Sequence, residues 1–112
     1  MSDKISISFK NKDEKSVALF NHLGGIEFAR EGLNYLKRLK EKLKKRKSNI
    51  INPLTRLEPG IVMVDFIRDY TKNMEIVESS LWLGKDENDG DNSDNGHFVI
   101  DINKEEIIKN GN

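Results

Sequence analysis

The 112-residue sequence predicts a single α+β domain, in which helices pack on one face of a small antiparallel sheet. Three patterns support this fold class. Apolar and polar residues alternate near the start, which predicts a strand. A long stretch repeats apolar residues every three or four positions, which predicts a helix, and two short apolar segments in the second half predict further strands. The expected order of elements is β-α-α-(α or β)-β-β-α.

The first strand is expected over residues 4–10, because isoleucine and phenylalanine alternate there with lysine and serine. Asn11 and Glu14 then have the spacing of a helix N-cap and a glutamate at the third helical position. This spacing predicts a short helix. Gly24-Gly25 is expected to end it, because glycine accepts the left-handed backbone of a helix C-terminus.

A second, longer helix is expected over residues 26–47. Its leucines recur at three- and four-residue steps, so they share one face. Gly32 lies inside this helix, where glycine costs about 1 kcal/mol relative to alanine. Beyond Tyr35 the polar positions are almost all basic, and Glu41 is the exception.

A linker is expected near residues 48–60, where two prolines mark turns. Two alternatives remain open for residues 61–70. The β-branched residues of this segment favour a strand, whereas the spacing of Val62, Phe66 and Tyr70 favours a helix, which is the preferred alternative.

Two strands that pair with each other are expected over residues 75–83 and 97–102. The segment between them, residues 84–96, is rich in aspartate, asparagine and glycine, which predicts a mobile acidic loop. Asn103 and Glu106 repeat the N-cap spacing, so a short terminal helix is expected to follow.

Charge is segregated along the chain. Residues 1–56 contain 14 Lys and Arg against 6 Asp and Glu, a balance of +8. Residues 57–112 contain 5 against 13, a balance of −8, and the net charge is zero. Such segregation indicates charged partners or association between copies of the chain, and a homodimer is one expected form.

The basic run in the long helix is the strongest functional signal. Lysine and arginine side chains that neutralise phosphates release counterions from a nucleic-acid backbone. The leading hypothesis is therefore a small, non-catalytic regulatory protein that binds nucleic acid. The proposed contact residues are Lys37, Arg38, Lys40, Lys42, Lys44, Lys45, Arg46 and Lys47. The alternative interpretation is a solvated helix surface with no ligand.

The order of a polar-faced strand, a short helix, Gly24-Gly25 and a long helix is similar to the ribbon-helix-helix layout of DNA-binding proteins. The resemblance covers about 45 residues. It departs from that layout in two ways: the second helix lacks a good N-cap residue, and it continues into lysines. The resemblance implies that the strand enters a DNA groove, whereas the alternative is an ordinary strand of an α+β sheet.

The acidic loop supports an alternative function, a protein-interaction module that acts through the acidic half. An inhibitor or adaptor encoded by a phage or mobile element fits the small size and the composition rich in lysine, asparagine and isoleucine. The candidate partner-binding residues are Asp86, Glu87, Asp89, Asp91, Asp94 and Trp82. Trp82 has a second interpretation as a core residue.

A metal site is not predicted in this loop. The EF-hand template, started at Asp91, is met at Ser93, Asn95 and Gly96. Its twelfth position is Ile102, where calcium needs a bidentate glutamate, so the template fails at its most diagnostic ligand.

No catalytic constellation and no cofactor motif is found, so an enzyme is not expected. The sequence has no cysteine, no phosphate-binding glycine loop and no H-E-x-x-H motif. His22 and His97 lack a metal-ligand spacing and are expected at the surface or at an interface. No apolar run is long enough for a membrane span and the start lacks a signal-peptide pattern, so a cytoplasmic protein is expected.

Overall fold

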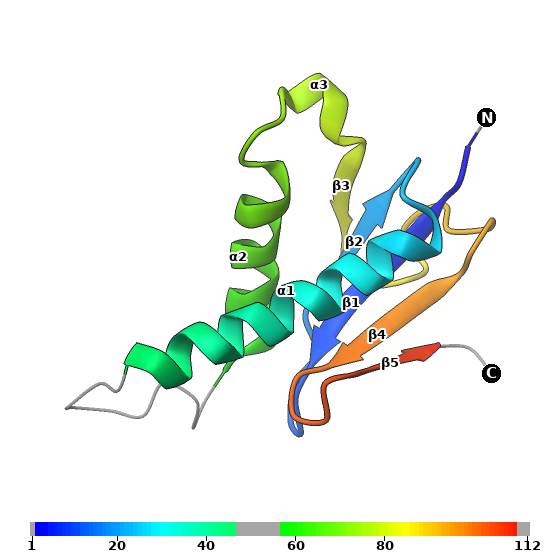
Figure 1. Ribbon diagram of the computed structural model, residues 1–112. Coiled ribbons are helices and arrows are strands. Elements are labelled where there is room, and N and C mark those ends of the chain that lie inside the picture. The colour runs from blue at the N-terminus through cyan, green and yellow to red at the C-terminus, as the bar shows by residue number, and fades with distance from the viewer. Residues whose placement is uncertain (1, 47–56, 110–112) are drawn as a thin grey trace.

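A mixed five-stranded sheet forms the centre of the protein, with strands in the order β3-β2-β1-β4-β5 (Figure 1). The computed structural model describes residues 2–46 and 57–109. The strands are β1 (Ile5–Lys10), β2 (Ala18–Asn21), β3 (Leu81–Gly84), β4 (His97–Asp101) and β5 (Glu106–Lys109). The helices are α1 (Gly25–Arg46), α2 (Pro59–Thr71) and the single turn α3 (Ile76–Ser79). The predicted α+β class is confirmed.

The sequence predicts an antiparallel sheet, but the observed sheet is mixed. β1 and β4 run parallel, with Ile7 opposite Phe98, whereas all other neighbouring strands are antiparallel. A parallel pair needs a long connection, and here that connection contains both long helices. In the strand order, β1 lies at the centre of the sheet, between β2 and β4. The expected pairing of the two later strands is wrong, because β3 pairs with β2 instead.

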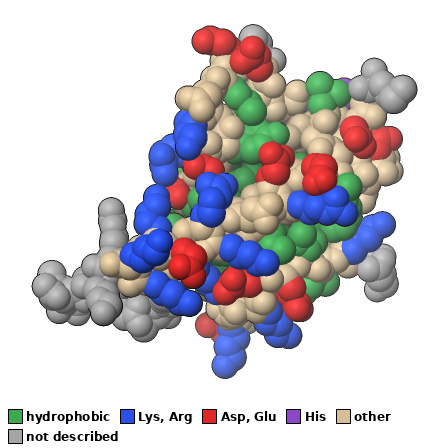
Figure 2. Space-filling view, viewed as in Figure 1, with side chains coloured by type: hydrophobic (Ala, Val, Ile, Leu, Met, Phe, Trp, Pro, Cys, Tyr) green, Lys and Arg blue, Asp and Glu red, His purple; other side chains and the backbone are tan. Residues whose placement is uncertain are grey.

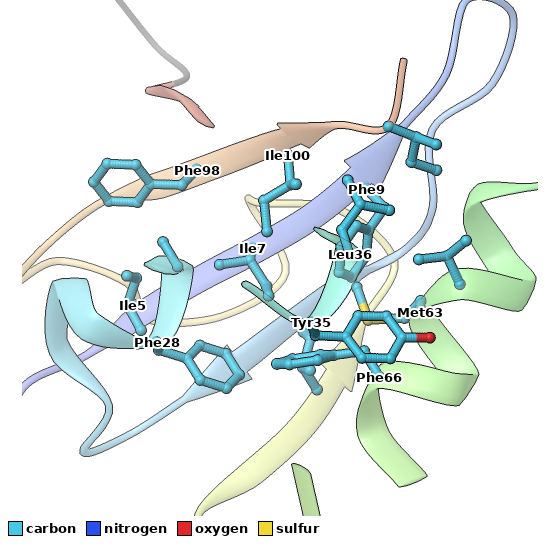
Figure 3. Close-up of a cluster of buried hydrophobic side chains, with 14 residues drawn as sticks. Ile5, Ile7, Phe9, Phe28, Tyr35, Leu36, Met63, Phe66, Phe98 and Ile100 are labelled. Atoms are coloured by element: carbon cyan, nitrogen blue, oxygen red, sulfur yellow. The ribbon is translucent and has the colours of Figure 1, made fainter. Parts of the chain in front are cut away.

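α1 and α2 cover one face of the sheet, and the main core lies between them and the strands (Figures 1 and 3). The alternating residues of β1 face this core as predicted: Ile5, Ile7 and Phe9 are all fully buried. Phe66 of α2 packs edge-on against Phe9, with ring centroids 5.8 Å apart. The preferred alternative for residues 61–70 is thus confirmed, since they lie within α2.

The predicted helix after Asn11 is wrong, because this segment is a hairpin that leads into β2. The Asn11 Oδ1 atom does accept hydrogen bonds from the backbone N–H groups of Asp13 and Glu14, at 2.9 and 2.7 Å. An N-cap and an asparagine turn use this same hydrogen bond. The chain then reverses, because the Ser16 N–H donates to the Phe9 carbonyl.

The predicted terminal helix is also wrong, and here the accepting side chain is that of Asp101, not that of the expected cap residue Asn103. Its first residues form the turn between β4 and β5, where Asp101 Oδ1 accepts from the N–H groups of Asn103 and Lys104. Glu105 then adopts a left-handed backbone, with φ at 54°, which stops helical continuation. The strand expected over residues 75–83 is shorter than predicted, because α3 takes up its first part.

The second face of the sheet is covered by the acidic loop. Ser6 and Ser8, expected on an open polar face, are buried beneath this loop. The Asn92 side chain donates to Ser6 Oγ at 2.8 Å, and the Asn95 N–H donates to the Lys4 carbonyl at 3.0 Å. The sheet is thus sandwiched between helices and a hydrogen-bonded loop. The mobility expected of residues 84–96 stays a prediction, and most of the expected linker lies outside the described residues.

Candidate functional site

The second half of α1 extends beyond the sheet, and Lys and Arg side chains gather there (Figures 1 and 2). We call this surface the basic face and define it by the exposed side chains on this half of the helix. They are Lys37, Arg38, Lys42, Lys44 and Lys45. Arg46 is the last residue of α1, and Lys47 lies outside the described residues.

Two of the predicted contact residues are occupied by partners within the protein. The Lys40 ammonium donates to the Ile102 carbonyl and lies 3.2 Å from the Glu105 carboxylate, which ties α1 to the turn before β5. Lys40 is only 19% exposed, so it belongs to the packing of α1 on the sheet. The Arg38 guanidinium pairs with Asp69 of α2 at 3.4 Å.

The remaining lysines of the basic face have a different environment. Among the described residues, no carboxylate lies within ion-pair distance of Lys37, Lys42, Lys44 or Lys45. Most of the basic face lines a shallow depression of about 400 Å³, together with Glu41. Like charges at three- and four-residue spacing repel one another, so an anion bound here would relieve that repulsion.

Asp65 of α2, which interacts electrostatically with Lys42, already has partners within the protein. Asp65 accepts a hydrogen bond from the Tyr35 hydroxyl at 2.5 Å, and it forms an ion pair with Arg68 at 2.8 Å. The Tyr35 hydrogen bond is the main reason that the pKa of Asp65 lies below its usual value. Burial and the same carboxylate raise the pKa of Tyr35. These contacts commit Asp65 to the α1–α2 interface, although it still contributes a weak field at Lys42.

The acidic loop does not cover the basic face, because its carboxylates bind elsewhere. Asp94 accepts from the Lys4 N–H at 2.9 Å, and Glu87 lies 3.8 Å from the Lys15 ammonium. The other predicted loop carboxylates accept backbone N–H groups of the loop itself: Asp86 from Asn88, Asp89 from Lys85 and Asp91 from Ser93. Hydrogen bonds from Ser93 lower the pKa of Asp91, and the Lys4 N–H lowers that of Asp94.

These contacts give the loop carboxylates a role in shaping the loop. A loop without regular structure leaves backbone donors unpaired, and short aspartate side chains satisfy them. In the part of the chain that the structure describes, no group of three or more His, Asp or Glu side chains is arranged to hold a metal ion. The near match to an EF-hand is thus explained by turn chemistry.

His97 was expected at the surface or at an interface, but it is buried under the acidic loop. Ser6 Oγ lies 2.7 Å from its Nδ1 atom, and Ser8 Oγ lies 3.1 Å from its Nε2 atom. A catalytic serine–histidine pair needs an accessible hydroxyl and a third group to orient the ring. Here both ring nitrogens are taken by buried serines. His22, by contrast, is exposed as predicted.

The sequence reasoning missed an apolar surface beside α2. Ile61 and Val64 are 64% and 68% exposed, and they line a groove of about 750 Å³ with Val17. A signal for it was present, because residues 61–64 are all apolar and a helix cannot bury four consecutive residues on one face. Trp82 is 44% exposed and stacks on Phe20, with ring centroids 4.3 Å apart.

Comparisons with protein-family models, with curated proteins and with solved structures find no match to this chain. Neither of the two long helices, nor α3, has the length and apolar character that a membrane crossing requires, within residues 2–46 and 57–109.

Proposed function

We propose that this protein is a small, non-catalytic nucleic-acid-binding protein that contacts phosphates through the basic face. The observation that carries the proposal is the set of four exposed lysines for which the described residues supply no carboxylate partner. Phosphates of a nucleic acid provide those partners, and the release of condensed counterions supplies the driving force.

The chemistry of the basic face favours recognition without base specificity. Lysine is a compact point charge that suits single phosphate oxygens. Arginine is better suited to reading a base edge, but Arg38 is engaged by Asp69. Contacts to the backbone position a protein on nucleic acid and carry no sequence information. Binding is therefore expected to depend steeply on salt and little on sequence.

The test compares two variants with the same change in charge. Replacing Lys42, Lys44 and Lys45 by glutamine removes three charges from the basic face. The matched control replaces Lys12, Lys85 and Lys104, which are exposed elsewhere. Fluorescence anisotropy with labelled duplex and single-stranded DNA is measured from about 50 to 200 mM salt.

The basic-face variant is expected to lose at least about tenfold in affinity and to show a shallower salt slope, by up to about 2.7 on duplex DNA. The control variant is expected to bind like the unchanged protein. Two results overturn the proposal: no binding of the unchanged protein at about 50 mM salt and micromolar concentration, or equal losses in both variants.

A further inference from the structure

We propose that the outer edge of β3 and the apolar groove beside it bind an extended segment of a partner protein, which joins the sheet as an additional strand. β3 is the last strand on its side of the sheet in the described part of the chain. Strand addition of this kind combines main-chain hydrogen bonds with pockets for alternate side chains. The proposal is independent of nucleic-acid binding.

The backbone geometry of β3 leaves its central hydrogen-bonding groups pointing outward. The His22 N–H donates to the Ser80 carbonyl at 3.1 Å, which defines these opposite residues as a hydrogen-bonded pair. Such pairs alternate along an antiparallel ladder. The backbone N–H and C=O groups of Trp82 therefore bond to β2, whereas those of Leu81 and Leu83 point away from β2. The outward N–H groups at the two ends already have partners within the protein: the Leu81 N–H donates to Ser79 Oγ at 3.5 Å, and the Lys85 N–H donates to Asp89 at 2.8 Å.

The side chains next to this edge form an apolar groove between β3 and the end of α2, and Figure 2 shows hydrophobic side chains exposed there. Leu83 lies opposite Leu19, so both face the helix side of the sheet. Leu83 is 56% exposed and Met74 is 39% exposed. The groove has a volume of about 410 Å³ and also contains Ile67 and Leu81. Every second side chain of an added strand would lie over this groove.

β3 lacks most of the features that usually prevent strand addition. Natural edge strands are protected by shortness, charged side chains, prolines or bulges. β3 is short, at four residues, but its sequence Leu-Trp-Leu-Gly contains no charge and no proline, and its register with β2 is regular. The opposite edge strand, β5, begins with Glu106 and ends with Lys109. The two edges of the sheet thus differ, and only β3 combines an uncharged sequence with an adjoining groove.

Charge indicates which segment fits. Glu75 and Glu78 precede β3, and Lys85 follows it directly, but Asp86, Glu87 and Asp89 come next, so both flanks are acidic on balance. In an antiparallel pair of two β3 strands, the acidic residues before one strand would meet those after the other, so a second copy of this chain is disfavoured. A segment with apolar residues at its centre and lysine or arginine at both ends matches the groove and the flanking carboxylates.

The test uses a synthetic peptide of about ten residues, with alternating valine and threonine at the centre and lysines at both ends. Binding is followed by NMR, through amide shifts and amide hydrogen exchange of ¹⁵N-labelled protein. The expected result is binding with slowed exchange of the Leu83 amide. Glutamate in place of the lysines is expected to weaken binding at least about tenfold, because it reverses the charge complementarity.

Two controls isolate strand addition. N-methylation of the peptide on the edge that faces β3 is expected to abolish binding, whereas N-methylation on the opposite edge leaves it unchanged. Replacing Leu83 by proline removes an outward N–H without removing a hydrogen bond to β2, so this variant is expected to fold and to lose binding. The Lys42, Lys44 and Lys45 variant is expected to bind the peptide normally, which separates this proposal from the proposed function.

The proposal is overturned if the peptide causes no shift at about 1 mM, or if shifts appear without protection at Leu83. It is also overturned if both N-methylated peptides bind equally, or if the glutamate peptide binds as tightly as the lysine peptide.

Discussion

At the scale of single residues, His97 is a titratable group held in an environment that opposes its charge. It is 5% exposed and lies between Ser6 and Ser8, beneath the loop that contains Asn92. Burial lowers its pKa below the usual value of 6.5. Glu87 and Asp86 act in the opposite direction, and Lys15 adds to the lowering. The neutral ring is therefore the form that the folded protein prefers.

We predict that the free energy of unfolding falls as the pH drops through the window below 6.5. In this window the unfolded chain binds a proton at His97 that the folded protein resists, so protonation favours unfolding. Above 6.5 the contribution is constant. Urea denaturation at about pH 7.5 and pH 5 measures the effect. Replacing His97 by asparagine is expected to flatten the dependence, and an equal pH dependence in both proteins would contradict the prediction.

At the scale of elements, Gly32 determines how closely α1 approaches the sheet. A Cβ atom at this position would lie 2.5 Å from Ile100 Cδ1 and 3.4 Å from Ile7 Cδ1. Both isoleucines are fully buried, so neither side chain has open space to move into. A glycine that looked like a weak point of the helix is thus a packing contact between α1 and the strands β1 and β4.

We predict that replacing Gly32 by alanine destabilises the protein, despite the better helix propensity of alanine. Overpacking in a filled core costs about 1–3 kcal/mol, whereas the propensity gain is about 1 kcal/mol. Adding the replacement of Ile100 by valine removes the Cδ1 atom and is expected to recover part of the loss. Gly60 to alanine is the matched control, because a Cβ atom there meets nothing within 4 Å. Chemical denaturation of the four proteins provides the comparison, and a more stable Gly32 variant would contradict the prediction.

The elements that could be predicted from the sequence are those with long periodic patterns. β1 alternates over six residues and α1 repeats over 22, so their faces were clear. The segments after Asn11 and Asp101 were misread, because a single side-chain hydrogen bond opens both a helix and a hairpin turn. What decides between them is the next strand's pairing with distant residues, which local spacing does not contain.

At the scale of the whole molecule, the two faces of the sheet are closed by different means. The helices bury the apolar side chains on one face, and a loop held by polar contacts buries serines and a histidine on the other. Gly90 brings that loop directly against Trp82, since a Cβ atom there would lie 1.8 Å from the indole ring. Trp82 is the only tryptophan in the sequence, so its fluorescence reports on this contact.

We predict that replacing Gly90 by alanine lifts the loop from the sheet without unfolding the helices. The added methyl group cannot share the space of the Trp82 ring, so the loop or the ring must shift. The expected results are a changed Trp82 emission spectrum, faster amide exchange in residues 85–96 and unchanged far-ultraviolet circular dichroism. Gly60 to alanine is again the control. Unaltered emission and exchange would show that the loop does not depend on this contact.

In the candidate site, as in the turns, the sequence alone did not show which distant residues come into contact. The run of lysines was visible in the sequence, but the partners of Lys40 and Arg38 lie on the β4–β5 turn and on α2. Only the assembled fold distinguishes the lysines that hold the protein together from those that remain exposed. The edge of β3 was hidden for a similar reason, because its neighbour in the sheet comes from the other half of the chain. The homodimer suggested by the charged halves stays a prediction.

The central place of β1 has a consequence for how this protein is made. Residues 5–10 complete one side of their ladder only when residues 97–101 have left the ribosome. At translation rates of about 5–20 residues per second, that wait is roughly 5–20 s. During it, Ile5, Ile7 and Phe9 lack the cover of β4, and for the first part of the wait they also lack that of α2, so the nascent chain displays the apolar face of β1. A period with an unpaired apolar strand face during synthesis is the consequence of building a sheet around its first strand.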